Sequence, residues 1–282
     1  MQLQRIQSNA PITEKRRFDE LIASVFGFTF EPWYSRGWWT PDYTVYALAE
    51  DDRLLASAGT YRMEMLIGGQ RQTWLQIGAV ATRPECRGQG LSRRLMQTIL
   101  EDYPNTPMFL CANASVLDFY PRFGFQRIHD RVPTLRCSPQ GSAAPLRPLG
   151  PDDPHVREML SRRACFSSTL DCLNAASVQA FHLLTEYPQC IYAVPGADAL
   201  VVAEQDGATL RLLDVCAAEP LSFAQLLPCL HFPGIDTIQF GFNPDWLGIE
   251  CGWSASQDED GLFVRGKFQL EPNFILPALL KT

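Results

Sequence analysis

The sequence lacks the features that most readily mark metal-binding, membrane and secreted proteins. Its 282 residues include only 4 histidines, and its 9 cysteines form neither a CxxC pair nor a Cys/His cluster with zinc-ligand spacing, so no metal site is expected. No apolar run approaches membrane-spanning length, and residues 1–17 contain no apolar segment of the kind found in signal peptides. We therefore expect reduced core thiols in a cytoplasmic protein without a membrane partner.

Positive charge is also in short supply. The formal net charge at pH 7 is −7, so the basic surface with which proteins bind nucleic acids is not expected, and a small cationic ligand is weakly favoured. Hydrophobic residues make up 46% of the chain and charged residues 20%, which is ordinary for a globular protein. At this length we expect one large domain or two domains of average size.

Hydrophobic periodicity in the first half predicts a mixed α/β layer. Helices are predicted at residues 17–27, 91–103 and 115–125, the last with a Ser cap, and an aromatic loop or short helix at 29–43. Strands are predicted at 43–50, 54–66, 72–84, 107–113 and 126–137, the first three antiparallel. The pair Gly68-Gly69 marks a tight hairpin between the second and third of these strands.

The second half repeats this pattern more weakly after a segment rich in Pro, Gly and Ser. Helices are predicted at 155–166, 177–188 and 222–230, a hairpin at 199–220 with its turn at Asp206-Gly207, and strands at 237–246 and 261–268. Residues 212–227 align with the strand-loop-helix segment of the first half, with the stretch RGQG deleted. We interpret this as an internal duplication; two unrelated domains, or one domain with an extension, are the alternatives. The predicted boundaries are 1–138, a linker at 139–154, and 155–282.

The stretch RGQGLS, residues 87–92, lies between a predicted strand and a predicted helix. It lacks the lysine of a P-loop, and Arg93 stands where a dinucleotide-binding fingerprint has its third glycine. What remains is a helix start with free backbone N–H groups, nearby arginines, and two glycines, Gly88 and Gly90, that can adopt conformations closed to other residues. The stretch therefore predicts a cradle for an anion of pyrophosphate size.

Together with a second motif, these residues resemble the general N-acetyltransferase (GNAT) superfamily. Arg87, Gly90 and Ser92 match its pyrophosphate loop, Q/R-x-x-G-x-G/A, with Ser in place of the final Gly or Ala. ANASVLDFYPRFGF, residues 112–125, resembles its second motif, in which Asn precedes a helix that ends in a tyrosine and a Gly-Phe pair. The resemblance covers residues 1–136. The tandem layout resembles the enhanced intracellular survival acetyltransferases, without the sterol-carrier-like domain that those proteins carry.

The resemblance implies a fold, a co-substrate and site residues. The implied fold class is α/β (α+β): a GNAT fold with a mixed, mostly antiparallel sheet flanked by helices, followed by a second, degenerate GNAT-like domain. Acetyl-CoA is the implied co-substrate, and Tyr120 the implied acid that protonates the leaving thiolate. The residues implied to hold acetyl-CoA are Ala79, Val80, Ala81, Thr82, Arg87, Gly88, Gln89, Gly90, Leu91, Ser92, Asn113 and Ser115.

The base that takes the proton from the amine is left open by the sequence. Some GNAT enzymes have a carboxylate at the position that matches Gln76. The amide of Gln76 cannot accept a proton, so water held by Gln76 or by backbone carbonyls is one route for removing the proton from the amine. Glu31, Asp42 and Glu64 are alternative bases, although each is more readily explained as a solvated surface carboxylate.

Four aromatic residues, Trp33, Tyr34, Trp38 and Trp39, crowd the segment before the first long strand. The resemblance places this region beside the acceptor, where rings stack on an apolar substrate or hold a cation. Core packing under an irregular loop explains the four residues equally well.

The function expected from the sequence is the transfer of an acetyl group from acetyl-CoA to the primary amine of a small, cationic acceptor, by an enzyme that is a monomer or homodimer. A non-catalytic protein that binds or senses acyl-CoA is the alternative. Tyr120 favours the enzyme, and the absence of a carboxylate at Gln76 leaves room for the alternative.

Overall fold

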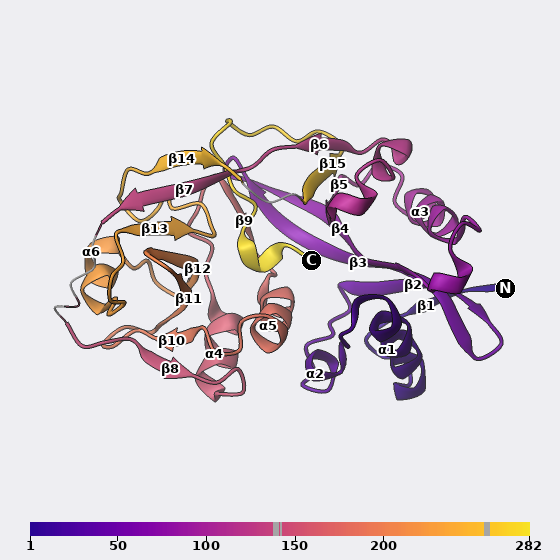
Figure 1. Ribbon diagram of the computed structural model, residues 1–282, viewed down its shortest axis with the longest axis horizontal. Coiled ribbons are helices and arrows are strands. Elements are labelled where there is room, and N and C mark those ends of the chain that lie inside the picture. The colour runs from indigo at the N-terminus through magenta and orange to yellow at the C-terminus, as the bar shows by residue number, and fades with distance from the viewer. Residues whose placement is uncertain (138–140, 142, 257–259) are drawn as a thin grey trace.

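The computed structural model describes residues 1–137, 141, 143–256 and 260–282, whose strands form two mixed sheets (Figure 1). The first sheet has the order β1 (Gln2–Ile6), β2 (Tyr43–Glu50), β3 (Arg53–Ile67), β4 (Gln70–Thr82), β5 (Met108–Ala112), β15 (Gly261–Arg265) and β6 (Gln126–Ile128), and β9 (Leu170–Cys172) pairs with β3 beside it. The second has the order β14 (Gly252–Ala255), β7 (Arg131–Arg136), β13 (Thr237–Phe240), β12 (Thr209–Ala217), β11 (Ala199–Asp206), β10 (Ile191–Ala193) and β8 (Arg147–Leu149). Residues 139, 140 and 142 of the predicted linker lie outside the described residues.

Helices cover both faces of the first sheet, because its central strands are apolar on both sides. Along β2, Val45 and Ala47 pack in the core under α1 (Ile12–Phe26), whereas Tyr46 and Leu48 pack in the core under α3 (Leu91–Asp102). This alternation is that of a strand buried on both faces. The short α2 (Glu31–Tyr34) and the α5 helix (Ala176–Thr185) share the core of α1, so one apolar core spans both halves of the chain.

The remaining helices are short, and η5, near the end of the chain, lies between the two sheets (Figure 1). They comprise α4 (Pro154–Arg162) and α6 (Phe223–Leu226), with the 3₁₀ turns η1 (Pro84–Cys86), η2 (Ala114–Val116), η3 (Tyr120–Phe123), η4 (Leu227–Cys229) and η5 (Ala278–Leu280). No helix among the described residues is both long and apolar enough to cross a membrane. No disulfide joins any two of the nine cysteines, all of which lie among the described residues.

The two sheets repeat one strand order, and each sheet contains one strand that comes from the other half of the chain. In each, a hairpin (β3–β4 or β11–β12) is followed by a strand parallel to its second arm (β5 or β13). The next place, beside β5, is taken by β15 from the end of the chain, and the matching place beside β13 is taken by β7 from the first half. The repeated order supports the internal duplication. The division at residues 138 and 155 stays a prediction, and the exchanged strands cross it.

Several elements differ from the predictions in detail. The helix predicted at 115–125 is replaced by η2 and η3, and Ser115 lies inside η2 and caps no helix. Pro121 accounts for the break, because it has no N–H and its ring collides with the preceding turn of a helix. The turn predicted at Asp206-Gly207 lies one residue later, between Asp206 and Thr209, whereas Gly68-Gly69 forms the predicted hairpin turn with φ of 56° and 75°. The strand predicted at 261–268 is β15, which joins the first sheet and not the second.

Candidate active site

The central strand β4 leaves its parallel neighbour part-way along the first sheet. β4 and β5 are in register at only two pairs, Leu75 with Met108 and Gln76 with Phe109. Just beyond, Ala79 has a φ of +49°, the register with β3 shifts, and the Ser57 hydroxyl donates to the Ala79 carbonyl over 3.0 Å. A bulge of this kind bends a strand and interrupts its ladder. The backbone after Gln76 therefore borders a gap between β4 and β5.

The start of α3 offers a row of unused N–H groups beside this gap. Gly88 and Gly90 both have a φ of +77°, and no side chain caps the helix. The first hydrogen bond of the helix runs from Arg94 N to Gly90 O, and no described residue accepts from the N–H groups of residues 88–93. A Cβ at either glycine would meet no atom within 4 Å, so the cradle is open. Such a helix start binds anions.

The bulge, the cradle and Tyr120 all border one groove of about 890 Å³. Most of the residues that the sequence predicted to hold acetyl-CoA line it: Ala79, Val80, Thr82, Arg87, Gly88, Gly90, Leu91, Ser92, Asn113 and Ser115. Two do not, because Ala81 is buried in the core and Gln89 lies outside the groove wall. The Thr82 and Ser92 hydroxyls are 2.7 Å apart and join the end of β4 to the start of α3.

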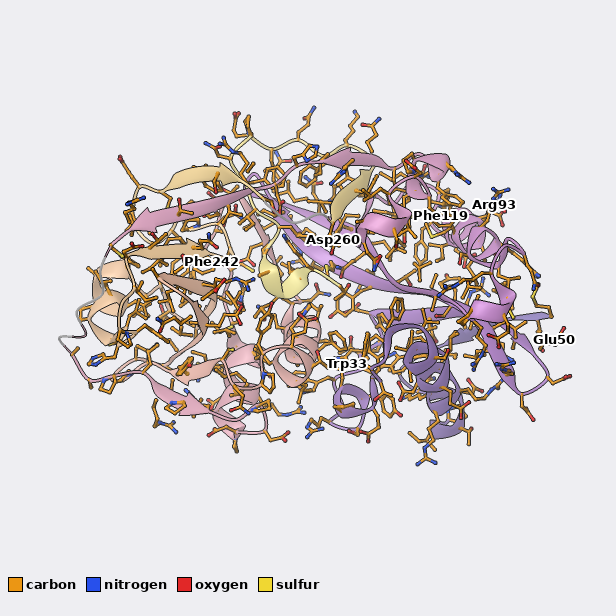
Figure 2. The ribbon with its side chains drawn as sticks, in the orientation of Figure 1. Trp33, Glu50, Arg93, Phe119, Phe242 and Asp260 are labelled. Atoms are coloured by element: carbon orange, nitrogen blue, oxygen red, sulfur yellow. The ribbon has the colours of Figure 1, made fainter. Side chains whose placement is uncertain are left out.

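The sequence reasoning missed several groove residues. Arg93 and Phe119 line the groove together with Val25, Phe26, Ile77, Gly78, Cys86, Cys111, Val116 and Thr282 (Figure 2). Arg93 was discoverable, since it lies three residues after Gly90 in the first turn of a predicted helix. The contribution of Thr282 to the groove could not be predicted, because nothing in the sequence places the last residues of the chain against β4.

Tyr120 is a neutral donor at the edge of the groove. Its side chain is buried between the rings of Phe119, Phe125 and Phe263, and burial raises its pKa to about 12. Its hydroxyl forms no hydrogen bond with any other described residue, although it belongs to a residue of the groove wall. At neutral pH this phenol therefore keeps a proton that it can donate to a developing anion.

The proposed bases are not gathered at this groove. Asp42 and Glu64 pair with Arg62 at 2.9 and 3.2 Å, and a hydrogen bond from Thr73 lowers the pKa of Glu64. Neither they nor Glu31 line the groove or the cavity beside it.

Gln76, by contrast, lies beneath the bulge. Its Nε2 donates to the Leu280 carbonyl over 2.5 Å, while its buried Oε1 has no partner among the described residues. One acceptor is therefore left to a water or a substrate, and the residue itself remains unable to take a proton.

A second cavity, of about 380 Å³, adjoins the groove at Phe26, Gly78, Ala79 and Thr282. Of the four aromatic residues noted in the sequence, Trp33 lines this cavity, with its Nε1 donating to Ser177 O of α5 (Figure 2). Tyr34 and Trp39 are buried in the core, and Trp38 carries Arg157 over its ring at 4.2 Å. The segment is thus partly core and partly cavity wall.

At the matching place, the described residues of the second half surround only a small space. On β12, Asp214 faces Arg163, whose guanidinium also lies 2.9 Å from Asp171; both aspartates are buried, and the Arg163 side chain is 9% exposed. The space around them is about 10 Å³. A buried ion pair therefore fills the position that the groove occupies in the first half. No group of three or more His, Cys, Asp or Glu among the described residues is placed to hold a metal ion.

Comparison with known proteins bears on this geometry. Residues 8–128 match the family model of the acetyltransferase (GNAT) domain, and no curated protein sequence matches the chain. Eis1 from Mycobacterium abscessus has a similar structure, with a TM-score of 0.56 and 15% identity over 93% of this chain and 73% of its own. A GCN5-related N-acetyltransferase from Anabaena variabilis ATCC 29413 also has a similar structure, with a TM-score of 0.56 and 17% identity over 94% of this chain and 72% of its own. A probable N-acyltransferase from Enterococcus faecalis V583 is similar as well, with a TM-score of 0.55 and 14% identity over 94% of this chain and 72% of its own.

These likenesses extend over both halves of the chain, and at such identities they establish the fold. They confirm the fold class predicted from the sequence, with mixed sheets flanked by helices in two GNAT-like halves. Residues 8–128 of this chain therefore resemble the acetyltransferase (GNAT) domain, within a tandem fold similar to that of Eis1.

Proposed function

We propose that this domain transfers an acetyl group from acetyl-CoA to a primary amine. The observation that carries the proposal is the groove, which brings an open anion cradle, a bulged strand and a protonated phenol to one space. A protein that only bound a phosphate would need the cradle and not the other two.

The cradle has the chemistry for the pyrophosphate of CoA. The N–H groups of residues 88–93 have no acceptor among the described residues, and Arg87 and Arg93 belong to the same wall. Oriented N–H groups with a helix dipole and adjacent cations suit a group with two negative charges. The open space at Gly88 and Gly90 lets phosphate oxygens approach the backbone. Asn113 and Ser115, across the groove, are proposed to contact the rest of the co-substrate.

The reaction joins the amine nitrogen to the acetyl carbon and breaks the bond from that carbon to sulfur. Backbone beside the bulge at Ala79 is proposed to polarise the carbonyl, and Tyr120 to give its proton to the departing thiolate. The amine must lose a proton, since only about one lysine-like amine in 2,500 is neutral at pH 7, a cost of about 4.6 kcal/mol. We assign that step to water held near Gln76, whose Oε1 is unpaired among the described residues.

Release of CoA thiol from acetyl-CoA, measured across a panel of primary amines with mass spectrometry of the products, tests the proposal. Acetylated amine and free CoA in equal amounts are expected. Tight binding of acetyl-CoA with no turnover on any amine would instead support the non-catalytic acyl-CoA sensor, which the lack of a carboxylate at Gln76 favours. We further propose that the protein acts in the cytoplasm as a monomer or homodimer, which light scattering and cell fractionation can test.

A further inference from the structure

The cavity beside Ala79 has an aromatic wall drawn from both halves of the chain. Seven of its fifteen lining residues are aromatic: Phe26, Phe28, Phe30, Trp33, Tyr43, Tyr61 and Phe181. Phe181 of α5 stacks on Phe30 with ring centroids 5.0 Å apart and meets Phe28 at 5.9 Å. At about 380 Å³ the cavity is within the size range of small-ligand sites.

The polar ends of two of these rings are occupied by the protein. Trp33 Nε1 donates to Ser177 O over 2.8 Å, and Tyr61 Oη donates to Asn174 O over 3.1 Å. Burial raises the pKa of Tyr43 and of Tyr61, so both phenols stay uncharged. The wall therefore offers ring faces and edges to a ligand and few hydrogen-bonding groups.

Charge inside the cavity is correspondingly scarce. Its charged lining residues are Glu186 and Lys281. The Glu186 side chain is 51% exposed and lies 3.2 Å from His182 Nδ1, and Lys281 Nζ lies 3.3 Å from Asp130. A second ammonium group on the acceptor would lose its hydration here without gaining a buried carboxylate.

Part of the cavity wall is exposed to solvent at a residue, Phe28, that does not line the groove. α1 ends at Gly27, which has a φ of +80°, and the flanking Phe26 and Phe28 are 41% and 38% exposed while they line the cavity. An acceptor needs an entrance apart from the groove, because it must arrive after the groove is filled by the co-substrate. An acyl chain needs none, since it arrives through the groove.

We propose that this cavity binds the non-reacting part of the acceptor, and that the acceptor is a primary monoamine with an aromatic or similarly bulky apolar group. The inference rests on the proposed function and narrows its acceptor. The amine supplies the single positive charge, at the Ala79 end, and the apolar group lies among Phe28, Phe30 and Phe181.

The experiment compares 2-phenylethylamine, n-butylamine and spermidine as acceptors with the full-length chain and acetyl-CoA. We expect kcat/KM for 2-phenylethylamine to exceed that for each of the others by roughly tenfold or more. Phe28→Ser, at a part-exposed position, should lower the ratio of phenylethylamine to butylamine about tenfold. Ile12→Ser, at an exposed apolar residue of α1 outside the cavity, is the matched control and should keep the ratio. Val178→Trp, which fills the cavity, should abolish the preference.

The outcomes separate this inference from the proposed function. If spermidine is the best acceptor and Phe28→Ser changes nothing, the apolar monoamine is wrong while the transferase stands. If octanoyl-CoA replaces acetyl-CoA in a Phe28-dependent way, the cavity holds an acyl chain and the acceptor assignment is overturned. If no amine releases CoA, the proposed function fails, and calorimetry of 2-phenylethylamine with the CoA complex tests whether the cavity binds an apolar amine. Binding that is lost in Phe28→Ser supports the cavity assignment, whereas no binding overturns it.

Discussion

At the scale of single residues, the proposed chemistry depends on the state of one hydroxyl group. Tyr120 is surrounded by the rings of Phe119, Phe125 and Phe263, which pack its ring and leave its hydroxyl without a hydrogen-bond partner among the described residues. The ring thus has a structural role that any aromatic residue can fill, whereas the hydroxyl has none visible in the packing. This separation makes the residue suitable for a conservative test.

Tyr120→Phe should lower kcat by roughly 100-fold or more and leave the Kd for acetyl-CoA nearly unchanged. The hydroxyl acts where thiolate charge develops, in the transition state, and its loss does not empty space in the core. Turnover, affinity and melting temperature are measured on the same preparation, with Tyr192→Phe in the second half as the matched control. Wild-type turnover in a folded Tyr120→Phe protein would remove this residue from the mechanism.

The raised pKa of Tyr120 also fixes the sign of the pH dependence. The acid form is the active one, so a pKa of about 12 extends the active range upward, beyond the ordinary phenol value of about 10. The acceptor amine is active when neutral, so kcat/KM should climb by about tenfold per pH unit from pH 7 to 9. A profile from pH 6.5 to 10.5 should therefore rise without a falling limb. A decline with an apparent pKa near 8 in the wild type, absent from Tyr120→Phe, would contradict the assigned acid.

At the scale of elements, the loop before α3 is built to leave its N–H groups open. Two left-handed glycines turn the chain, no side chain caps the helix, and the Thr82–Ser92 hydroxyl contact holds the helix start against β4. An ordinary N-cap would satisfy one of these N–H groups internally and reduce their affinity for an anion. The exposed N–H groups therefore cost stability, which the proposed binding of a pyrophosphate would restore.

Gly90→Val should reduce acetyl-CoA affinity at least tenfold in calorimetry while the protein stays folded. The isopropyl group enters the cradle, and the φ of +77° costs a β-branched residue about 1–2 kcal/mol. Gly196→Val is a matched control, because Gly196 has a φ of +73°, meets no atom within 4 Å and lies outside the groove. Equal affinities in the two variants would mean that residues 87–92 do not bind the pyrophosphate.

At the scale of the whole molecule, the two halves are tied together by the exchange of β7 and β15. β15 pairs with β5 over five residues and with β6 over three, and it is almost wholly buried. β7 contains Pro133, which is tolerated because β13 pairs with β7 only at residues 134–136. Pro133 could not donate to a full ladder with β5, so β7 is a poor substitute for β15.

A fragment of residues 1–138 should therefore fail to give the cooperative thermal unfolding of the full chain. It leaves β6 without its neighbour in the sheet and removes α5 from the core of α1. Circular dichroism on heating, with the full-length protein as control, tests this expectation. A fragment that melts cooperatively and binds acetyl-CoA as the intact chain does would show that the first half is independent of the exchange.

The same two-half layout predicts one acetyl-CoA per chain. The buried Arg163–Asp171–Asp214 cluster leaves about 10 Å³ where the first half has its groove, and the short α6 follows β12 without an arginine-glycine loop. Calorimetric titration should give a stoichiometry close to one, at a site whose affinity Gly90→Val reduces. Two equivalent sites per chain would mean that the second half is not degenerate.

Some features of the fold and of the candidate site can be predicted from the sequence, and others cannot. Local features can be predicted, because backbone freedom and hydrophobic period act within a few residues. They include the glycines of the hairpin and the cradle, the helix start at Leu91 and the strand before it. The break at Pro121 is equally local, but the apolar pattern around it predicts a continuous helix, which the structure does not have. Boundaries shifted by a residue, as at Asp206, where turn residues leave more than one register open.

The sequence by itself determined the glycine-containing turn into the helix at Leu91, the β-rich pattern of residues 43–50, and the GNAT resemblance of residues 1–136. Only the tertiary structure decided that β15 completes the first sheet, that α5 supplies Phe181 to the cavity beside Ala79, and that Gln76 meets Leu280. The physical reason is separation along the chain: strand pairing and burial depend on the whole core, and Gln76 and Leu280 are 204 residues apart. No local pattern records which distant strand fills a gap that several strands could fill.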